Sequence, residues 1–364
     1  MLEIKNLVVR AGNFTLDGVN LSVEAPGCHV LLGPTGSGKT VFLETIMGLK
    51  RPHQGEIRLE GKDITGLPPE RRGISYLPQD LALFPHLTVR ENILYGLTVR
   101  KIKQGAAYWF AYELVETLGI KHILDRSTRH ISGGEKQRVA LARAIAPGCK
   151  FLILDEPLSA LHEGLKKELW FLIKDLKKKY GLAIFMVTHD TEEAFFLGDR
   201  ISVIIDGLVH QTGEKEEVYG CPETIEVARF FGIGNLFEAE VMEETEENII
   251  AMCKELNSKL TLSKAAGPSC PLRPGSLITI GIRPENALIL RPDLKRPEQS
   301  NLLAGEITDV FQKGPSSIVL FSAERTNRII EIEIPGYAFS KLNIAQGDSV
   351  DVTLKSENIF CMPR

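Results

Sequence analysis

The chain has 364 residues, which exceeds the usual size of one domain, so two domains with separate cores are expected. Apolar residues make up 43% and charged residues 25%, which are ordinary values for a globular protein. The formal net charge is -4 and there is no basic arm or tail, so we expect no nucleic-acid partner bound through bulk electrostatics.

Cysteine usage and hydropathy narrow the class of protein further. The six cysteines are scattered without a CxxC pair, which disfavours a zinc site or a redox motif and is typical of reduced thiols. The segment MLEIKNLVVR lacks an apolar signal core, and no run approaches about 18 apolar residues. We therefore expect a cytosolic protein that contacts a membrane only through another protein.

Residues 1–230 alternate short apolar strands with helical stretches. HVLLG precedes the helical TVFLETIMGL, and FLILDEP precedes LKKELWFLIKDLKKKYG and then LAIFMVTHD. This alternation predicts an α/β domain in which helices cover a parallel sheet.

The first motif is the loop GPTGSGKTVF, which follows an apolar strand and opens a helix. Its glycines, lysine and threonine match GxxxxGK[ST], a loop whose backbone N–H groups surround phosphate oxygens. Lys39 adds a full positive charge, and the Thr40 hydroxyl is a candidate ligand for Mg²⁺. The candidate nucleotide-binding residues are Gly33, Pro34, Thr35, Gly36, Ser37, Gly38, Lys39 and Thr40.

Two acidic residues end the apolar strand FLILDEP. Ligands of such sheets lie at the carboxyl ends of strands, so Asp155 and Glu156 should face the same phosphates. Asp155 is a candidate Mg²⁺ ligand, and Glu156 is a candidate general base for the attacking water. A solvated strand end carries the same residues, so this motif is weak on its own.

The stretch ISGGEKQRVALARAI predicts a capped helix. Ser132 and Glu135 form a capping-box pattern, whereas Gly133 and Gly134 are not needed for an ordinary cap. Paired glycines clear side chains from exposed N–H groups, which predicts a second anion site.

Taken in order, these motifs resemble the ATP-binding subunit of an ABC transporter. The resemblance covers about 230 residues and also includes the loop SYLPQDLALFPHLTV, the SAL segment and VTHD. It implies a homodimer in which two copies stack head to tail. Each ATP is then held by the phosphate loop of one copy and by Ser132–Glu135 of the other.

The resemblance also assigns roles to Gln79 and His189. Gln79 is expected to meet Mg²⁺ or the attacking water, and His189 to donate to the γ-phosphate. Residues 80 to about 130 are expected to form a helical insert that docks on integral membrane permease subunits. Trp109 and Phe110 are predicted to lie in the core of this insert.

Two positions depart from the family pattern. His162 stands where the family has Asp after SAL, which leads to the hypothesis that communication between the two ATP sites is altered. Ala11 stands where the family has an aromatic residue that stacks on adenine. Phe14 is the nearest ring and is a candidate for stacking, with core packing as the alternative.

Residues 231–364 contain short Val/Ile-rich runs between Gly, Pro and Asn turns, which predicts a small all-β domain like an OB-fold or barrel. This part resembles the regulatory domains of ABC importers, and the chain looks most like those for molybdate or tungstate. Asn301, Leu303 and Gly305 match part of an oxyanion-binding box, whose preceding residues are reduced to Ser300.

The sequence therefore predicts an ATPase that uses ATP and Mg²⁺ on the cytoplasmic face of the membrane. It would drive import of molybdate or tungstate through a separate permease, served by a periplasmic or extracellular oxyanion-binding protein. Importers of sulfate, sugar or polyamine remain alternatives because they share the ATP-site residues. A non-transport ABC ATPase acting on nucleic acid or ribosomes is a further alternative, disfavoured by the near-neutral charge.

Overall fold

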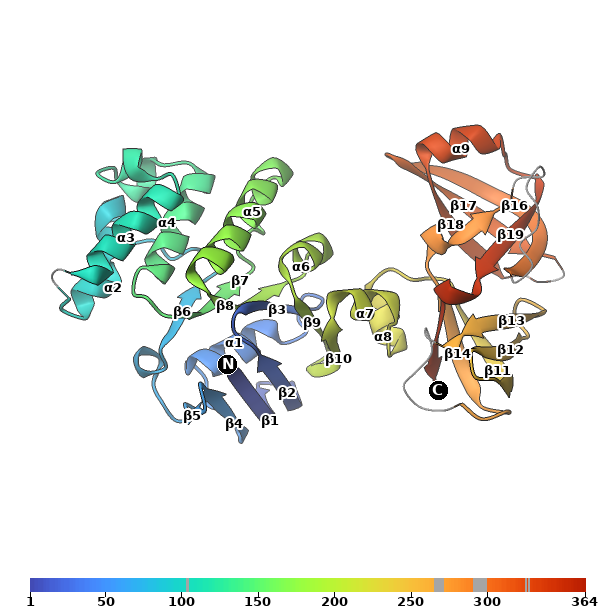
Figure 1. The fold of residues 1–364 in the computed structure, drawn as a ribbon, viewed down its shortest axis with the longest axis horizontal. Helices are drawn as coiled ribbons and strands as arrows, with labels where there is room; N and C mark the ends of the chain where they lie inside the picture. The colour runs from blue at the N-terminus through green and yellow to red at the C-terminus, as the bar shows by residue number, and fades with distance from the viewer. Residues whose placement is uncertain (103–104, 265–271, 291–299, 325, 327) are drawn as a thin grey trace. The chain divides into compact units, whose positions relative to one another are not determined.

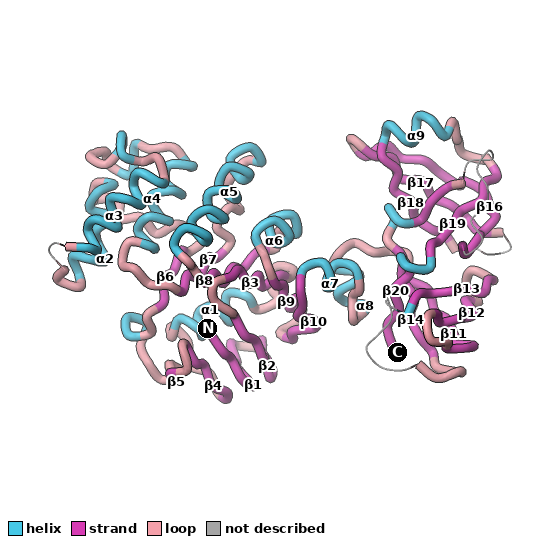
Figure 2. Tube along the Cα trace, viewed as in Figure 1, coloured by secondary structure: helices cyan, strands magenta, loops and turns pink. Residues whose placement is uncertain are grey.

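The computed structural model describes the chain except for residues 103–104, 265–271, 291–299, 325 and 327. It divides into two compact units, Met1–Lys215 and Glu216–Arg364. Figure 1 shows the order of the elements, and Figure 2 shows that the first unit mixes helices with strands whereas strands dominate the second. The predicted α/β domain with a helical insert, followed by an all-β domain, is confirmed.

A six-stranded sheet forms the centre of the first unit, in the order β10-β9-β3-β8-β7-β6. All neighbouring strands are parallel except β10, which is antiparallel to β9. Parallel strands place their carboxyl ends at one edge, and this edge carries the motifs. The strands are β3 (Gly27–Leu32), β6 (Ile74–Leu77), β7 (Phe151–Asp155), β8 (Ala183–Thr188), β9 (Arg200–Ile205) and β10 (Leu208–Glu214).

A smaller antiparallel sheet packs against the first one through α1 (Lys39–Met47). Phe42 of α1 is fully buried and meets the Phe185 ring edge-on at 5.9 Å between centroids. Side chains from both sheets and α1 share this core. The sheet has the order β2-β1-β4-β5 and comprises β1 (Leu2–Ala11), β2 (Phe14–Val23), β4 (Gln54–Leu59) and β5 (Lys62–Asp63).

Helices α2 (Val89–Val99), α3 (Ala106–Thr117) and α4 (Gly133–Ile145) group together in the first unit (Figure 1). The prediction that Trp109 lies in the core is wrong, because its side chain is 78% exposed. The buried face of α3 is Ala111, Leu114 and Val115, and Trp109 lies about 200° around the helix from Ala111. Phe110 is half-buried, with its ring edge-on to the Tyr180 ring at 5.2 Å between centroids.

The remaining helices of the first unit are α5 (Glu163–Tyr180) and α6 (Thr191–Leu197). Their caps follow the sequence: Gly181 ends α5 in the left-handed conformation, and Asp190 caps α6 by accepting from the N–H of Glu193. None of the helices in the described part of the chain combines the length and the apolar character needed to cross a membrane.

The second unit is an all-β, barrel-like domain with one shared core. One sheet has the order β13-β12-β11-β14-β20 and the other β15-β19-β16-β17-β18. The first comprises β11 (Leu236–Glu244), β12 (Asn248–Cys253), β13 (Ser258–Ser263), β14 (Leu277–Ile282) and β20 (Ile359–Pro363). The second comprises β15 (Ala287–Ile289), β16 (Ser300–Lys313), β17 (Ser316–Ala323), β18 (Ile329–Pro335) and β19 (Ser349–Lys355).

The units divide fifteen residues before the predicted boundary near residue 230. Helices α7 (Lys215–Gly220) and α8 (Ile225–Phe230) lie between the observed division and the predicted boundary. Helix α9 (Gly336–Leu342) follows β18. Ala228 of α8 and the following Ile233 pack with Phe360 and Met362 of β20. A contact with a strand 130 residues further along the chain leaves no signal in the local pattern around α8.

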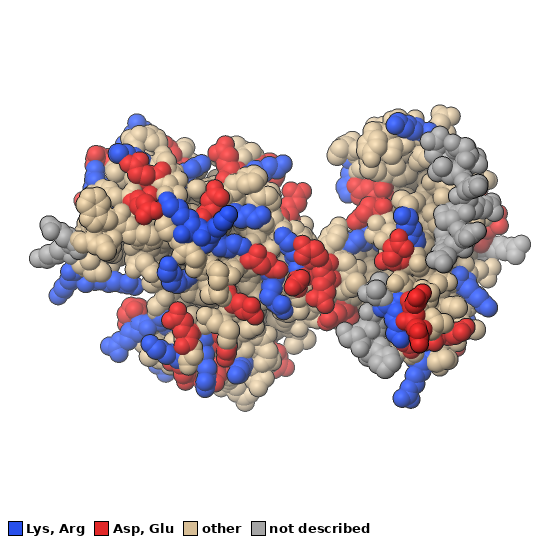
Figure 3. All heavy atoms as spheres, viewed as in Figure 1, with Lys and Arg blue, Asp and Glu red and all other residues tan. Residues whose placement is uncertain are grey.

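Charged side chains of both signs are interspersed on the face of the first unit that Figure 3 shows. Several of them form ion pairs at the surface, such as Lys177 with Asp199 at 2.7 Å and Lys179 with Glu113 at 2.8 Å. Mixed charge of this kind gives no broad field of one sign on that face.

Candidate active site

The loop between β3 and α1 is shaped by glycines that no other residue would replace easily. Gly36 and Gly38 have φ angles of 86° and 99°, in the left-handed region that favours glycine. A Cβ on Gly38 would come within 2.3 Å of the Phe14 ring, so a side chain there would also clash. The N–H of Ser37 donates to the Pro34 carbonyl at 3.2 Å and closes the turn. The backbone N–H groups are thereby gathered at the first turn of α1.

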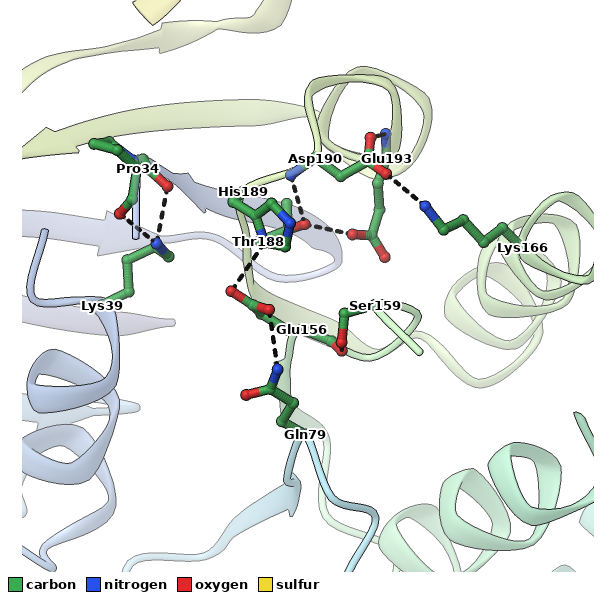
Figure 4. Close-up of polar contacts among 11 residues, drawn as sticks. Pro34, Lys39, Gln79, Glu156, Ser159, Lys166, Thr188, His189, Asp190 and Glu193 are labelled. Atoms are coloured by element: carbon green, nitrogen blue, oxygen red, sulfur yellow. Dashed lines mark hydrogen bonds and ion pairs between the residues drawn. The ribbon is translucent and has the colours of Figure 1, made fainter. Parts of the chain in front are cut away.

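Lys39 lies inside this turn with its side chain nearly buried. Its Nζ donates to the carbonyls of Gly33 and Pro34, each at 2.8 Å (Figure 4). Burial lowers the pKa of Lys39, while the nearby carboxylates of Glu156 and Asp155 act in the opposite direction. The ammonium therefore lies at the positive end of α1, close to the acidic strand end.

The hydroxyls of the loop differ in exposure. Ser37 is buried, and its Oγ has no hydrogen-bond partner within the described residues. Thr40 and Thr35 are exposed at the loop surface. An orphaned hydroxyl, glycine backbone and a lysine at a helix N-terminus together fit a polyphosphate, because all of these groups supply hydrogen bonds or positive charge.

Asp155 ends β7 and is almost completely buried. Burial raises the pKa of Asp155, and a hydrogen bond from Tyr76 opposes that shift. The Tyr76 hydroxyl donates to Oδ2 of Asp155 at 3.1 Å from the neighbouring strand β6. Burial and this carboxylate together raise the pKa of Tyr76, so the phenol remains a proton donor at neutral pH. Sequence reasoning missed Tyr76; the only signal is its place three residues before Gln79.

Glu156, the next residue, receives side chains from two other strand ends. Gln79 Nε2 donates to Oε2 of Glu156 at 3.2 Å, and His189 Nδ1 lies 3.1 Å from Oε1 (Figure 4). An ionised carboxylate only accepts hydrogen bonds, so Nδ1 carries the proton in this contact. The three residues predicted to be catalytic thus come together from the ends of β6, β7 and β8.

The backbone at Glu156 is itself unusual. Its φ of 41° is left-handed, which costs a residue with a Cβ about 1–2 kcal/mol. The N–H of Glu156 donates to the Val187 carbonyl at 2.9 Å, and its carbonyl accepts from the Ser159 hydroxyl at 3.1 Å. These bonds hold the strained residue in place, and local strain of this kind is concentrated at functional sites.

A buried carboxyl group supports the loop that carries His189. Thr188 Oγ1 and Glu193 Oε2 are 2.5 Å apart, and the N–H of Asp190 donates to the same hydroxyl at 3.0 Å. Oε1 of Glu193 is buried without a partner in the described part of the chain. Burial raises the pKa of Glu193 to about 7, so this carboxyl holds its proton far more tightly than an exposed one. Lys166 of α5 forms an ion pair with Asp190, with Nζ 3.0 Å from Oδ2.

The predicted capping box is present at the start of α4. The Ser132 N–H and hydroxyl both donate to Oε2 of Glu135, at 2.7 and 2.8 Å, and His122 lies 3.4 Å from Oε1. The hydrogen bonds from Ser132 lower the pKa of Glu135. A Cβ on Gly133 or Gly134 would meet Leu161 or Leu165 at 3.8 and 3.5 Å, which are ordinary contacts. The packing of the chain itself therefore does not explain these two glycines.

In the described part of the chain, polar contacts do not connect these four residues with the rest of the predicted site. Among the described residues, no hydrogen bond or ion pair joins Ser132–Glu135 to the phosphate loop or to Glu156. The other predicted groups converge within one copy of the chain.

Sequence reasoning also missed Gln137 on α4. Its buried side chain donates to the carbonyl of Pro157, the residue after Glu156. A polar residue on the otherwise apolar buried face of the helix is the signal that was available.

Ala11 and His162 occupy the two positions that depart from the family pattern, and Phe14 is the candidate ring for adenine. Phe14 pairs with Ala11 across the β1–β2 turn, and its half-buried ring lies against Gly38 and Gly207. His162 is exposed at the N-cap of α5, where its side chain makes no capping hydrogen bond.

Asn301 in the second unit has a structural explanation. Its side chain accepts from the Thr261 N–H at 2.6 Å and donates to the carbonyls of Thr261 and Leu354, at 2.8 and 2.9 Å. A Cβ on Gly305 would come within 2.1 Å of the Ser322 carbonyl. Strand pairing therefore accounts for both residues.

Comparison with known proteins supplies the family. Residues 16–159 match the ABC transporter family. The chain is also 35% identical over 363 residues to the molybdate/tungstate import ATP-binding protein WtpC of Pyrococcus horikoshii, covering 100% of both chains. The chain belongs to the ABC transporter ATP-binding proteins. It is an ATPase that binds nucleotide.

Further relatives of this ABC ATPase include a second WtpC protein and a polyamine import protein. It is 46% identical over 227 residues to the WtpC protein of Archaeoglobus fulgidus, covering 62% of this chain and 92% of that protein. It is 38% identical over 312 residues to the spermidine/putrescine import ATP-binding protein PotA of Roseobacter denitrificans, covering 85% and 84%.

Solved structures resemble the first part of this ABC ATPase. The ADP conformation of the ATP-binding cassette MJ1267 aligns with a TM-score of 0.56 and 27% identity, covering 64% of this chain and 98% of that one. The dimeric structure of the cassette MJ0796 aligns with a TM-score of 0.52 and 28% identity, covering 59% and 99%.

Proposed function

We propose that this ABC ATPase powers the import of molybdate or tungstate. The observation that carries the proposal is the full-length similarity to a molybdate/tungstate import ATP-binding protein, which includes the second unit as well as the ATPase unit. The spermidine/putrescine import proteins match at similar identity over a slightly smaller share of the chain, so polyamine import is the second candidate.

The geometry of the first unit supports the following division of labour during hydrolysis. Lys39 and the N–H groups of Gly36–Thr40 other than that of Ser37 bind the β- and γ-phosphates, and Glu156 accepts the proton of the attacking water. Gln79 and His189 orient the Glu156 carboxylate. Gln79 also contacts the attacking water, and His189 donates to the γ-phosphate. Phe14 is the ring assigned to adenine.

Magnesium is the metal that suits the donors at this site. Thr40, Gln79 and Asp155 offer oxygen ligands, which Mg²⁺ prefers, and the ion would neutralise charge on the phosphates. The described residues include no cluster of three or more His, Cys, Asp or Glu side chains that would hold a metal unaided. Phosphate and water therefore complete the coordination in this proposal.

A second copy of the chain completes the ATP site in this proposal. Among the described residues, no hydrogen bond or ion pair joins Ser132–Glu135 to the phosphate loop of their own chain, and the packing around Gly133 and Gly134 does not require glycine. A head-to-tail homodimer gives these residues a phosphate ligand, and the dimeric MJ0796 cassette provides a structural precedent. The dimer would dock on a membrane permease at the cytoplasmic face and receive oxyanion from a separate binding protein outside the membrane.

Purification from native membranes tests the transport assignment. We expect an integral membrane permease to copurify, together with ATPase activity stimulated by a binding protein loaded with molybdate or tungstate. Sulfate and spermidine, each with its own binding protein, serve as matched substrates, and Glu156→Gln is the inactive control. Stimulation by spermidine alone would favour polyamine import. Recovery of ribosomes without a permease would contradict the transport hypothesis.

A further inference from the structure

Two consecutive residues in the loop after Gln79 adopt a strained backbone conformation. Leu81 and Ala82 have φ angles of 61° and 41°, and neither is a glycine. Left-handed backbone persists at residues with a Cβ only when surrounding contacts hold it.

Arg143, in the last turn of α4, supplies them. Its Nη1 donates to the Ala82 carbonyl at 2.5 Å and its Nη2 donates to the Leu81 carbonyl at 2.6 Å. The guanidinium carbon also lies 5.2 Å from the centre of the Phe84 ring. A planar guanidinium with two parallel donors fits two successive carbonyls better than the single charged point of a lysine.

The far side of the same loop is fixed to α2. Asn92 is completely buried, accepts from the Phe84 N–H at 2.9 Å, and donates to the Phe84 carbonyl at 3.1 Å. Thr128 donates to that carbonyl from the other direction at 3.3 Å. The loop is therefore anchored at both of its ends, by the Leu81 N–H to the Pro78 carbonyl and by the side chains of Arg143 and Asn92.

The Arg143 guanidinium contacts no carboxylate in the described part of the chain. Its side chain is half-buried, burial lowers its pKa, and the more distant Asp80 opposes that shift. No ion pair to Arg143 is found among the described residues, so the two backbone carbonyls and the Phe84 ring are its partners. A half-buried cation that donates only to backbone carbonyls indicates that the conformation of those carbonyls matters.

The helix that carries Arg143 also reaches the other side of Glu156. Gln137 of α4 donates to the Pro157 carbonyl, while Gln79, two residues before Leu81, donates to Glu156 itself. Helix α4 thus contacts the backbone on both sides of the Gln79–Glu156 hydrogen bond, and it begins directly after Ser132.

We propose that Arg143 is a positioning residue that holds Leu81 and Ala82 in the left-handed conformation and thereby keeps Gln79 on Glu156. The inference rests on the proposed role of Gln79 in hydrolysis. Arg143 touches neither nucleotide nor water in this assignment, and it acts only through the loop. Since glycine adopts the left-handed conformation without a Cβ penalty, glycines at 81 and 82 should replace much of what Arg143 does.

The first test measures ATP hydrolysis by full-length Arg143→Met. We expect kcat to fall roughly ten- to a hundredfold while the KM for ATP changes by less than about twofold, because orientation is lost and phosphate binding is kept. The kcat of Arg143→Lys should lie between those of the wild type and Arg143→Met, since one ammonium cannot form the paired hydrogen bonds. Arg138→Met is the matched control, because Arg138 lies on the same helix but donates to Leu118 and Glu168.

The second test is rescue. Leu81→Gly combined with Ala82→Gly should restore a large part of kcat in the Arg143→Met protein and should restore nothing in the Arg138→Met protein. If Arg143→Met does not fold, the same comparison is made with Arg143→Lys. Failure of the glycines to raise kcat in a folded Arg143 variant would overturn the proposal.

A double-mutant cycle separates this inference from the proposed role of Gln79. In a Gln79→Ala background, Arg143→Met should lower kcat by less than about twofold, because the residue it positions is gone. An undiminished effect of Arg143→Met in that background would show that Arg143 acts elsewhere. If Gln79→Ala alone leaves kcat unchanged, the role of Gln79 fails and the positioning function fails with it.

Discussion

His189 Nδ1 lies 3.1 Å from Oε1 of Glu156, and the same carboxylate accepts from Gln79 through its other oxygen. One carboxylate is thus held on both sides by groups from neighbouring strand ends. A group held in this way is oriented without being neutralised, which suits a general base.

Glu156→Gln should retain nucleotide binding and lose hydrolysis. The amide keeps the size of the side chain but cannot accept a proton, so we expect kcat to fall at least about a hundredfold. In excess ATP and Mg²⁺ the variant should elute as a dimer in size-exclusion chromatography, and it should return to monomer when ATP is removed. A Glu156→Gln protein that stays monomeric with ATP and Mg²⁺ would contradict the proposed dimer.

Tyr76→Phe should shift the pH dependence of hydrolysis. The Tyr76 hydrogen bond holds the pKa of Asp155 down against the effect of burial, so its removal raises that pKa further. Asp155 then becomes protonated at higher pH, and the acid limb of kcat/KM moves upward. We also expect about a tenfold loss of Mg²⁺ affinity or activity at neutral pH. Tyr95→Phe is the control, and identical pH profiles for the two variants would refute the role of Tyr76.

Glu193→Gln should remove a pH dependence of stability. Burial raises the pKa of Glu193 from 4.5 to about 7, so the folded state favours the neutral carboxyl. Its stabilising contribution is complete below about pH 4.5 and is lost as pH rises through about 7, by roughly 3 kcal/mol in total. Denaturant titrations from pH 5 to 8 should show this decline in the wild type and in the exposed control Glu192→Gln, but not in Glu193→Gln. The idea fails if all three proteins follow parallel curves.

Phe14→Leu distinguishes stacking on adenine from packing against the phosphate loop. Leucine fills much of the space beside Gly38 but has no ring, so adenine stacking predicts a rise of about threefold or more in the KM for ATP. Phe14→Tyr should keep the wild-type value. An unchanged KM in Phe14→Leu, together with a raised KM in Phe14→Ala, would assign Phe14 to packing.

His162→Asp should have two separable effects. His162 makes no capping hydrogen bond, so Asp or Asn at this N-cap should stabilise the protein by about 1 kcal/mol in thermal or denaturant unfolding. Only the Asp variant restores the carboxylate typical of the family, so only this variant should change the Hill coefficient for ATP. Equal Hill coefficients in the wild type, His162→Asp and His162→Asn would count against altered communication between the sites.

The strand-end residues could be predicted because each of them follows an apolar strand of a parallel sheet. Asp155, Glu156, Gln79 and His189 lie where that pattern places them, and the phosphate loop has the predicted strand and helix on either side. The all-β second unit was also predictable, since its alternating Val/Ile runs are local features.

Features that depend on contacts between distant segments could not be predicted. Tyr76, Gln137 and Arg143 are functional candidates only because of what they meet across the fold. Trp109 misled the prediction because its large ring suggests burial, whereas its position on α3 decides the matter. The strain at Glu156, Leu81 and Ala82 is invisible in the sequence because none of these residues is a glycine.

Helix α4 has a mechanical consequence that follows from its length. Its 13 residues span about 20 Å, with the Ser132 cap at one end and Arg143 near the other. If such a rod tilts by about 5° around its first turn, its far end moves by nearly 2 Å, enough to break hydrogen bonds of normal length. In the proposed dimer, a small displacement of the Ser132 end of the helix would therefore become a larger displacement at the loop after Gln79.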